Sequence, residues 1–468
     1  INPKTYKLDS RIDKEALSVM KHHGLSIQPI LNNFITVPGK QGNFSGEMLH
    51  TILHDQNIQN NLIAQIITTL KQNQLHGINI DFEEIKENSD QYLNAFMKNL
   101  YTQFKQNGLI VSIDVMPDNT DYDIKYLKDF TDYFIVMAYD QFNDNTQAGP
   151  ISDQKWIEKI MDAIGKDVPS EKLILGIGAY GRQWITDENG TRIEDITYSQ
   201  AIDRAKISKS IINFDDNTYN LHYAYDFAGS AGEFASKNSV WFTDAATAFN
   251  IIRFSDDYRN AGTAIWRLGS EDPRIWTFYN RDLGTPALKK QPFNFSLLEI
   301  MPPNFNSKPT AIGSGELINI LYSPQQGRTK ITVDKNETLI SEEVYNQLPS
   351  GFLYEKFAED STKIGPGHKI ILTFDDGPSA EFTPKILEIL KREKVPATFF
   401  LIGENAEANI PLVQQINRMG YEIGNHTFTH GNLARMSPER AALELKTTRS
   451  LIEAITGKST VLFRAPYN

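Results

Sequence analysis

Apolar and polar residues along the chain follow two periods that predict strands and helices in regular succession. Short apolar or alternating segments predict strands, and the segments between them repeat apolar residues with helical spacing. Strands that alternate with helices form parallel sheets covered by helices. In the first part of the chain we expect strands at 26–32, 77–83, 109–115, 134–140, 173–179 and 263–268, and helices at 13–24, 58–75, 91–106, 123–129, 154–165 and 244–258.

These six units predict an α/β fold, a TIM-type (β/α)₈ barrel whose first two strands are missing, because a closed barrel of this class has eight. We therefore expect the sequence to be cut from a longer protein. Residues 186–241 break the pattern with short segments rich in Asn, Asp, Gly and Tyr. This insertion either lines the rim of the barrel with Tyr219, Tyr223, Tyr225 and Trp241 or packs its aromatic residues against one another.

The second half of the chain changes its pattern twice. Pro, Gly and Ser punctuate a linker, in which 317–322 and 328–333 alternate like short strands. Strand and helix patterns then alternate again from residue 369 to residue 464. We expect three parts, which are a barrel over 1–285, a linker with a small β-rich connector over 286–367, and a second α/β domain over 368–468.

Composition and charge exclude several classes of function. The chain has 47 Lys and Arg against 58 Asp and Glu, and this net charge of −11 disfavours non-specific nucleic-acid binding. It has no cysteine, so disulfides and thiol chemistry are excluded. It contains no phosphate-binding loop of the nucleotide-dependent synthases.

One predicted strand carries several polar groups on the same face. Side chains alternate along a strand, so Asn79, Asp81 and Glu83 share one face and the apolar residues between them share the other. The alternative is the solvated face of an antiparallel sheet. Acidic groups directed into a covered parallel sheet are costly unless they are partnered or used in function, which favours a catalytic role.

Three segments resemble glycoside hydrolase family 18, the chitinase-like barrels. Residues 77–83 resemble its D-G-x-D-x-D-x-E signature, M-A-Y-D at 137–140 its later M-x-Y-D strand, and A-I-W at 264–266 its closing strand. Asn79 replaces the first aspartate of the D-x-D-x-E core, as in the branch that cleaves bacterial peptidoglycan, including spore cortex-lytic N-acetylglucosaminidases. The resemblance covers about residues 1–278.

The resemblance implies a substrate-assisted retaining cleavage of β-1,4 glycosidic bonds that needs no cofactor. In this mechanism the 2-acetamido oxygen of the substrate attacks the anomeric carbon. Glu83 would be the general acid, Asp81 would bind the acetamido N–H and stabilise the oxazolinium, and Tyr139 would hold the acetamido oxygen. Because Asn79 removes one charge from the cluster, we expect a pH optimum different from that of relatives with three carboxylates.

Other residues are candidates for substrate binding. Asp140 and Gln141 stand at the end of their strand, and Asn79 faces the same interior as the carboxylates. Trp266 ends the last strand, on the side where sites form in this fold, and is either a sugar-stacking residue or part of the core.

The second domain carries ligand-type residues at strand ends. They are the two aspartates of T-F-D-D-G-P at 373–378, then His426 and His430, then R-A-P-Y at 464–467. Two imidazoles and one carboxylate form a common catalytic metal set, although an isolated H-x-x-x-H is more often incidental. In this order the three motifs match carbohydrate esterase family 4, the NodB-like polysaccharide deacetylases.

This second resemblance implies a partial, deformed (β/α) barrel with a divalent metal, zinc being the expected ion. Asp375 would take a proton from water that the metal activates, Arg464 would orient Asp375, and the Tyr467 backbone N–H would bind the oxyanion. The sequence ends before the remaining motifs of the family, so we expect metal binding with weak deacetylation. The expected metal ligands are Asp376, His426 and His430.

Both resemblances point to N-acetylglucosamine polymers such as chitin, peptidoglycan or an exopolysaccharide. We expect a bifunctional bacterial enzyme outside the cytoplasmic membrane, in a longer chain that continues into a membrane-anchored glycosyltransferase. The alternative is a carbohydrate-binding protein of the chitinase-like lectin type, part of a larger polysaccharide synthase with little hydrolytic activity. Retention of the acid residues and of the complete metal set disfavours that alternative.

Overall fold

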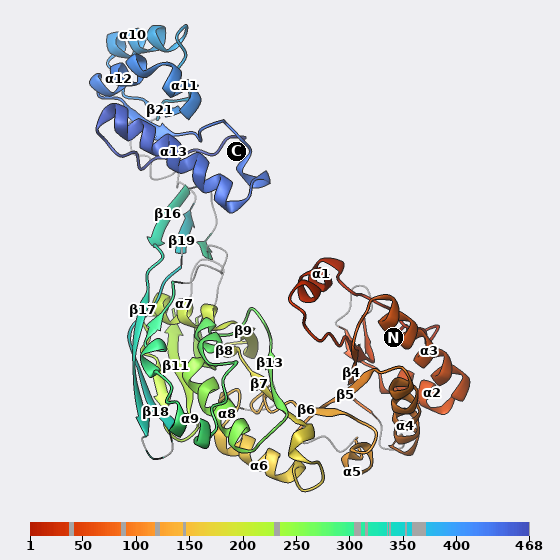
Figure 1. Cartoon of the computed structure of the whole chain (residues 1–468). Helices are drawn as coiled ribbons and strands as arrows, with labels where there is room; N and C mark the ends of the chain where they lie inside the picture. Colours follow the sequence, from red (N-terminus) through yellow and green to blue (C-terminus); the bar gives the residue numbers. More distant parts are fainter. Residues whose placement is uncertain are drawn as a thin grey trace. The chain divides into compact units, whose positions relative to one another are not determined.

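The chain divides into two compact units, Ile1–Ala358 and Glu359–Asn468, in a computed structural model (Figure 1). The predicted connector over 286–367 falls mostly within the first unit, and its expected end lies outside the described residues. The domain boundaries expected from the sequence stay predictions. The structure describes residues 1–36, 42–85, 90–117, 122–143, 147–228, 235–303, 310–313, 317–334, 336, 338–351, 353–357 and 371–467.

A six-stranded sheet forms the centre of the first unit, and every neighbouring pair in it is parallel. Its strands match all six predicted β segments, which confirms the α/β prediction, although several strands are shorter than expected. Both faces of the sheet are largely buried, as expected for strands between layers. In spatial order the strands are β1 (Ile30–Asn32), β4 (Gly77–Asp81), β5 (Ile110–Val115), β6 (Tyr133–Val136), β7 (Leu173–Gly178) and β13 (Gly262–Trp266).

Helices connect successive strands and bury their apolar faces against the sheet (Figure 1). Helix α2 (Gly46–His54) was not predicted, although Ser45 caps it by accepting a hydrogen bond from the Met48 N–H at 3.2 Å. A nine-residue helix gives too short an apolar repeat to recognise reliably. The predicted helices are present as α1 (Lys14–His22), α3 (Gln56–Gln72), α4 (Asp90–Gln106), α5 (Ile124–Leu127), α6 (Gln154–Ile164) and α8 (Ala245–Asp257).

The insertion is a five-stranded antiparallel sheet with one helix, α7 (Tyr198–Ser208). Tyr223 is buried in a core between this sheet and α7, and its hydroxyl donates to the Ala201 carbonyl at 2.6 Å. The insertion therefore packs against itself at Tyr223, one of the two predicted alternatives. In spatial order its strands are β10 (Asn213–Asp215), β11 (Asn220–Phe227), β12 (Ser236–Phe242), β8 (Gly181–Asp187) and β9 (Gly190–Ile196).

The connector is rich in strands, as its alternating pattern predicted, and these strands form two small sheets. The first joins β14 (Ile300–Met301), β17 (Gly327–Asp334) and β18 (Leu339–Gln347), and the second joins β15 (Thr310–Gly313), β19 (Leu353–Phe357) and β16 (Leu317–Tyr322). Asn250 of α8 exchanges two hydrogen bonds with the Ile340 backbone, each 2.9 Å long. The first of these sheets is therefore an integral part of the first unit.

A buried arginine links the barrel to this sheet. The Arg274 guanidinium lies 2.6 Å from Asp272, 3.1 Å from Asp244 and 3.4 Å from Glu343 of β18, and all four side chains are almost fully buried. Asp244 also accepts a hydrogen bond from the Tyr345 hydroxyl at 3.0 Å. A buried charge is tolerated only when it is paired and hydrogen-bonded, so these contacts depend on one another.

The second unit repeats the alternation of strands and helices. A three-stranded parallel sheet has the order β20 (Thr373–Gly377), β21 (Thr398–Leu401) and β22 (Glu422–Asn425). The predicted strand 461–464 contributes a single bridge between Phe463 and Asn425. The helices are α10 (Thr383–Glu393), α11 (Gly403–Ala408), α12 (Ile410–Arg418) and α13 (Pro438–Thr456).

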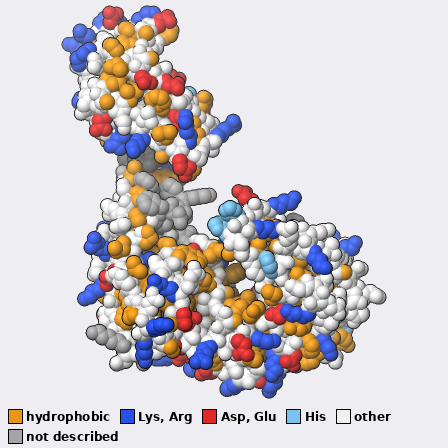
Figure 2. Space-filling view, in the orientation of Figure 1, with side chains coloured by type: hydrophobic (Ala, Val, Ile, Leu, Met, Phe, Trp, Pro, Cys, Tyr) orange, Lys and Arg blue, Asp and Glu red, His pale blue; other side chains and the backbone are white. Residues whose placement is uncertain are grey.

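The surface carries both signs of charge. On the face drawn in Figure 2, Lys and Arg side chains are interspersed with Asp and Glu side chains on both units. Among the described residues, none of the helices combines the length and the apolar character needed to cross a membrane.

We expect Arg274→Ala to lower the free energy of unfolding of the first unit by about 3 to 5 kcal/mol, because three buried acid groups lose the guanidinium that they contact. The matched control is Arg192→Ala, which removes an ion pair of an exposed arginine and should cost less than about 1 kcal/mol. Urea unfolding followed by tryptophan fluorescence measures both. Equal losses in the two variants would contradict the structural role assigned to Arg274.

Candidate active site and candidate metal centre

The segment that follows β4 is held by two side chains from other parts of the chain. The Glu83 N–H donates to Asn33 Oδ1 at 3.1 Å, and Asn33 Nδ2 donates to the Glu83 carbonyl at 2.8 Å. The Tyr122 hydroxyl donates to the Phe82 carbonyl at 2.7 Å. Asn33 is fully buried, so the backbone that carries Glu83 is fixed although it lies beyond the end of the strand.

Asn79 and Asp114 form a hydrogen-bonded pair on the interior side of the sheet. Asn79 Nδ2 donates to Asp114 Oδ2 at 2.6 Å, and Ser112 Oγ donates to Asn79 Oδ1 at 2.7 Å. Asn79 carries no charge, as the sequence showed, and β5 supplies a carboxylate that the sequence interpretation did not count, so the expected difference in pH optimum stays a prediction. Both polar atoms of Asn79, which we predicted to bind substrate, have protein partners.

Burial and mutual repulsion shift the acid groups of this cluster. Burial raises the pKa of Glu83 to about 7, and the charges of Asp81, Glu84 and Asp140 raise it as well. Burial also raises the pKa of Asp81, against a hydrogen bond with the Asn32 side chain. These groups therefore retain protons at a pH at which exposed carboxyl groups are ionised.

Asp114 experiences the same environment. Its burial raises the pKa to about 7, the charges of Asp81 and Glu83 add to that effect, and the Asn79 hydrogen bond opposes it. The charges of Asp81 and Glu83 thus disfavour ionisation of Asp114.

Tyr139 stands beside this cluster and is mostly buried. Burial raises its pKa, and the negative charge of Asp114 is the largest of several that raise it further, so its hydroxyl stays protonated. Gly176 and Gly178 of β7 leave the space that its side chain occupies, since a Cβ atom would lie 3.2 Å from the ring at Gly176 and 2.8 Å from the Tyr139 Cβ at Gly178. The small residues of β7 therefore admit the tyrosine into the site.

Asp140 is directed into this region by a left-handed backbone conformation with φ of 60°. Its carboxylate accepts hydrogen bonds from the Tyr180 hydroxyl and, at 2.6 Å, from Arg182 Nη2 of β8. Arg182 is buried and also donates to Asp195 at 2.7 Å. The insertion thus contributes a cation to the edge of the carboxylate cluster.

The remaining predicted residues of this site take different positions. The Gln141 side-chain oxygen accepts the Asp153 N–H at 2.7 Å, at the start of α6, so that atom already has a protein partner. Trp266 ends β13 with 48% of its surface exposed, which excludes the alternative of a buried core residue.

The sequence interpretation missed Asp114, Arg182, Tyr180 and Asn33. Asp114 had a usable signal, because Ser112 and Asp114 alternate with apolar residues on β5 as Asn79 and Asp81 do on β4. The other three lie in a loop or in the insertion, where no periodic pattern distinguishes them. Their roles follow only from contacts between segments far apart in the chain.

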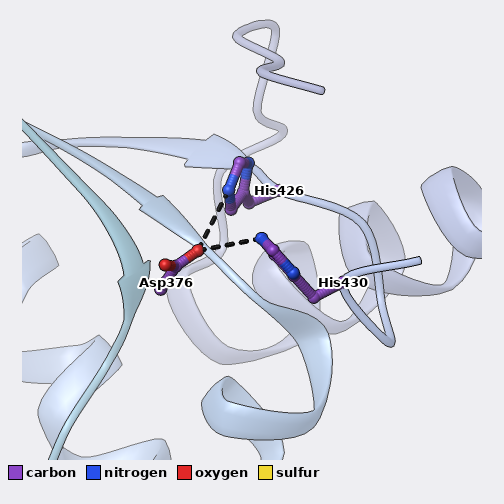
Figure 3. Close-up of side chains that lie close together, drawn as sticks. All are labelled: Asp376, His426 and His430. Carbon is purple, nitrogen blue, oxygen red and sulfur yellow. Dashed lines mark ion pairs between the residues drawn. The ribbon is translucent and has the colours of Figure 1, made fainter. Parts of the chain in front are cut away.

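Three side chains of the second unit meet at strand ends (Figure 3). Asp376 Oδ1 lies 3.2 Å from His426 Nε2 and 3.1 Å from His430 Nε2. Ligand atoms about 2.1 Å from a tetrahedral zinc ion lie about 3.4 Å apart, so this spacing fits one ion. The structure therefore brings together all three predicted metal ligands.

The tautomer of His426 also fits a metal ligand. Its Nδ1 lies 2.8 Å from the Arg464 carbonyl, which requires the proton on Nδ1 and leaves the Nε2 lone pair facing Asp376. Metal-binding histidines are usually oriented in this way by a second partner. One carboxylate and two imidazoles suit a divalent transition metal that keeps open positions for water.

Asp375 and Arg464 form the ion pair that the sequence predicted. Arg464 Nη1 lies 2.7 Å from Asp375 Oδ1 and 2.9 Å from Thr373 Oγ1. Its guanidinium carbon is 4.3 Å from the centre of the Phe400 ring, which supports the planar group. Tyr467 is 68% exposed, and its ring centre lies 4.9 Å from that of His430.

Glu444 of α13 supports the loop between the two histidines. Its Oε2 accepts the Phe428 N–H at 2.9 Å and the Thr429 N–H at 2.8 Å, and its Oε1 accepts the Thr429 hydroxyl at 3.0 Å. Arg440 pairs with the same carboxylate at 2.9 Å. These bonds lower the pKa of Glu444 despite burial, so the carboxylate stays ionised beneath the loop.

Two protein families match the chain. Residues 31–272 match glycosyl hydrolases family 18, and residues 362–468 match the polysaccharide deacetylase family. The chain is 45% identical to a peptidoglycan-N-acetylglucosamine deacetylase of Bacillus cereus over 105 residues, which are 22% of this chain and 38% of that protein. It is 23% identical to the cortical fragment-lytic enzyme of Bacillus anthracis over 256 residues, 51% of this chain and 56% of that protein.

A solved structure shares the fold of the first unit. The spore cortex-lytic enzyme SleL of Bacillus megaterium aligns with a TM-score of 0.52 and 22% identity, covering 58% of this chain and 63% of that one. The chain thus spans about half the length, or less, of these two curated relatives.

We expect Glu444→Gln to weaken zinc binding by about tenfold to a hundredfold, because an amide cannot accept all the hydrogen bonds that fix the His426–His430 loop. The matched control is Glu453→Gln, an exposed residue of the same helix. Competition with a chromophoric chelator measures the affinities. Equal affinity in the two variants would contradict a supporting role for Glu444.

Proposed function

Because the chain belongs to glycosyl hydrolases family 18 and carries a polysaccharide deacetylase domain after that region, we propose that it cleaves and deacetylates N-acetylglucosamine polymers. The observation that carries the glycosidase part is the cluster of Asp81, Glu83 and Asp114 beside Tyr139, with the pKa of Glu83 raised to about 7. The substrates we propose are β-1,4 polymers such as chitin, peptidoglycan or an exopolysaccharide.

In the glycosidase reaction Glu83 is the general acid. The acetamido carbonyl oxygen of the substrate attacks the anomeric carbon, the bond to the leaving sugar breaks, and the Glu83 proton goes to the glycosidic oxygen. Water then attacks the anomeric carbon of the oxazolinium and gives a proton to the Glu83 carboxylate, which restores the acid. A carboxyl group with a pKa near 7 holds its proton for the first step and accepts one in the second.

The neighbouring residues position the sugar. Asp81 accepts the acetamido N–H and carries negative charge beside the cationic intermediate, and the Tyr139 hydroxyl donates to the acetamido oxygen. Trp266 offers an exposed ring for stacking at the end of β13. Asp140 binds a sugar hydroxyl from the position that Arg182 fixes. Gln141 binds substrate through its side-chain amide nitrogen alone.

In the deacetylase reaction Asp376, His426 and His430 hold a divalent cation, which we propose is zinc. When bound, the cation would lower the pKa of water and polarise the acyl carbonyl. Asp375 accepts the proton of the attacking water, and Arg464 keeps its carboxylate oriented. Tyr467 contributes its backbone N–H to the developing oxyanion.

We also propose where the protein acts and where its domains begin and end. Relatives named for peptidoglycan and spore cortex suggest action outside the cytoplasmic membrane. The working boundaries are a glycosidase domain over 1–285, a connector over 286–367 and a deacetylase domain over 368–468. A glycosyltransferase portion in a longer chain has no support in the comparisons, and the proposal does not depend on one.

We expect Glu83→Gln to lower the cleavage of chitin oligomers by about a thousandfold, because the leaving oxygen loses its proton donor. Oligomer binding, measured by calorimetry, should stay within about threefold of the wild type. Glu188→Gln, an exposed residue of the β8–β9 hairpin, is the matched control and should retain full activity. A wild-type protein that binds oligomers without cleaving them would instead indicate a lectin.

We expect removal of the metal to abolish deacetylation and to leave glycosidic cleavage unchanged. Mass spectrometry of products from chitin oligomers and muropeptides, with and without a chelator, separates the two activities, and added zinc should restore the first. Calorimetric zinc titration of the wild type and of Asp376→Asn tests the ligand set independently of turnover. Loss of acetyl groups that persists after complete metal removal would contradict the esterase assignment.

A further inference from the structure

Asn79 occupies a position at which the signature that this chain resembles has an aspartate. An amide at that position removes an acid group from β4, and the rest of the signature keeps Asp81 and Glu83. A cationic intermediate in a mostly buried site needs negative charge close to it. Another part of the chain would therefore have to supply the acid group that β4 lacks.

The neighbouring strand places a carboxylate beside this amide. In the register of the sheet Asn79 is opposite Ser112, so Asp114 stands one repeat further along β5, level with Asp81. Ser112 Oγ donates to Asn79 Oδ1 at 2.7 Å, which turns the amide nitrogen toward Asp114 Oδ2 at 2.6 Å. The orientation of Asn79 is thus fixed from both ends by β5.

The surroundings of Asp114 connect it with the groups that contact substrate in the proposed function. The charges of Asp81 and Glu83 act on Asp114, and Asp114 is in turn the largest charge acting on Tyr139, on which Asp140 acts as well. An N–H that donates to a carboxylate favours the ionised form, so Asn79 opposes the effect of burial and of the neighbouring charges on Asp114. A second aspartate in the place of Asn79 would instead compete with Asp114 for a proton.

We propose that Asp114 replaces, from β5, the carboxylate that Asn79 removes from β4, and that it is a positioning residue for Asp81 and Glu83. Held by Asn79 one strand away, its charge adds to the negative charge around the cationic intermediate and helps Glu83 to retain its proton. This inference rests on the proposed function of the site.

A purely structural role of Asp114 would tolerate other side chains at this position. If Asp114 only satisfied the buried amide of Asn79, any neutral side chain of the same shape that accepts a hydrogen bond would serve equally well. An asparagine side chain at this position can still accept the Asn79 N–H through its oxygen, so Asp114→Asn removes the charge and leaves the contact possible.

The experiment exchanges the two groups across their hydrogen bond in the full chain. Asp114→Asn is compared with the double variant Asn79→Asp/Asp114→Asn, which returns the carboxylate to β4 and keeps the net charge and shape of the pair. The pH profile of kcat/KM on chitin oligomers, which falls as the pH rises through the pKa of Glu83, is the principal measurement. Thermal unfolding of each variant shows whether it is folded.

We expect Asp114→Asn to lower kcat/KM about tenfold and to move the basic limb of the profile down by about one pH unit, because loss of a neighbouring negative charge lowers the pKa of Glu83. The double variant should return to within about threefold of the wild type, with its basic limb restored. A profile of Asp114→Asn identical to that of the wild type, or a double variant as defective as Asp114→Asn, would overturn the inference.

The controls separate the possible failures. If Asp114→Asn does not fold, the comparison of the double variant with the wild type decides. The inference requires that exchanging the two groups leaves kcat/KM nearly unchanged. The single variant Asn79→Asp sets two carboxylates at hydrogen-bond distance, and its pH profile should differ from those of the wild type and the double variant. Turnover in the wild type with no effect in these variants refutes only this inference, whereas absence of turnover in the wild type refutes the proposed function and the inference with it.

Discussion

A charged or polar side chain inside a covered parallel sheet has no water to bind, so it must find a partner within the protein or give up its charge. The first site follows from this constraint. Asn79 is satisfied by Ser112 and Asp114, while Asp81 and Glu83 respond to burial with raised pKa values. The acid groups at the ends of β4 and β5 therefore keep their protons at a higher pH than exposed carboxyl groups do, which is what a catalytic acid requires.

The same constraint has other outcomes elsewhere in the chain. At Arg274, one guanidinium contacts three buried acid groups, and the result is a structural link between the barrel and β18. At the metal centre, Asp376 is 65% exposed and the Nε2 atoms of His426 and His430 face it. The Arg274 guanidinium has its charged partners within the protein, whereas the metal-centre donors are arranged around a point that a cation can occupy.

The sequence predicted elements wherever a single segment carries the signal. All six central strands and the ligand triad of the second unit were predicted, because alternation and motif spacing are local properties. The carboxylates of the first site were predicted incompletely, because Asn79 was considered without the neighbouring strand that carries Asp114. Asn33 and Arg182 were missed for the same physical reason, since they act on Glu83 and Asp140 across long sequence separations.

The two proposed reactions use the same chemical group of the substrate. Cleavage by the first site needs the acetamido oxygen as its nucleophile, and the second site removes the acetyl group that contains this oxygen. A sugar that has been deacetylated therefore offers no nucleophile to the site around Glu83 and Asp81, although its glycosidic bond is intact. It follows that deacetylation protects a residue of the polymer from cleavage on its reducing side. The two activities of one chain would then decide which glycosidic bonds remain. A sugar that the first site reaches first is cleaved, and a sugar that the second site reaches first is deacetylated and its bond is protected.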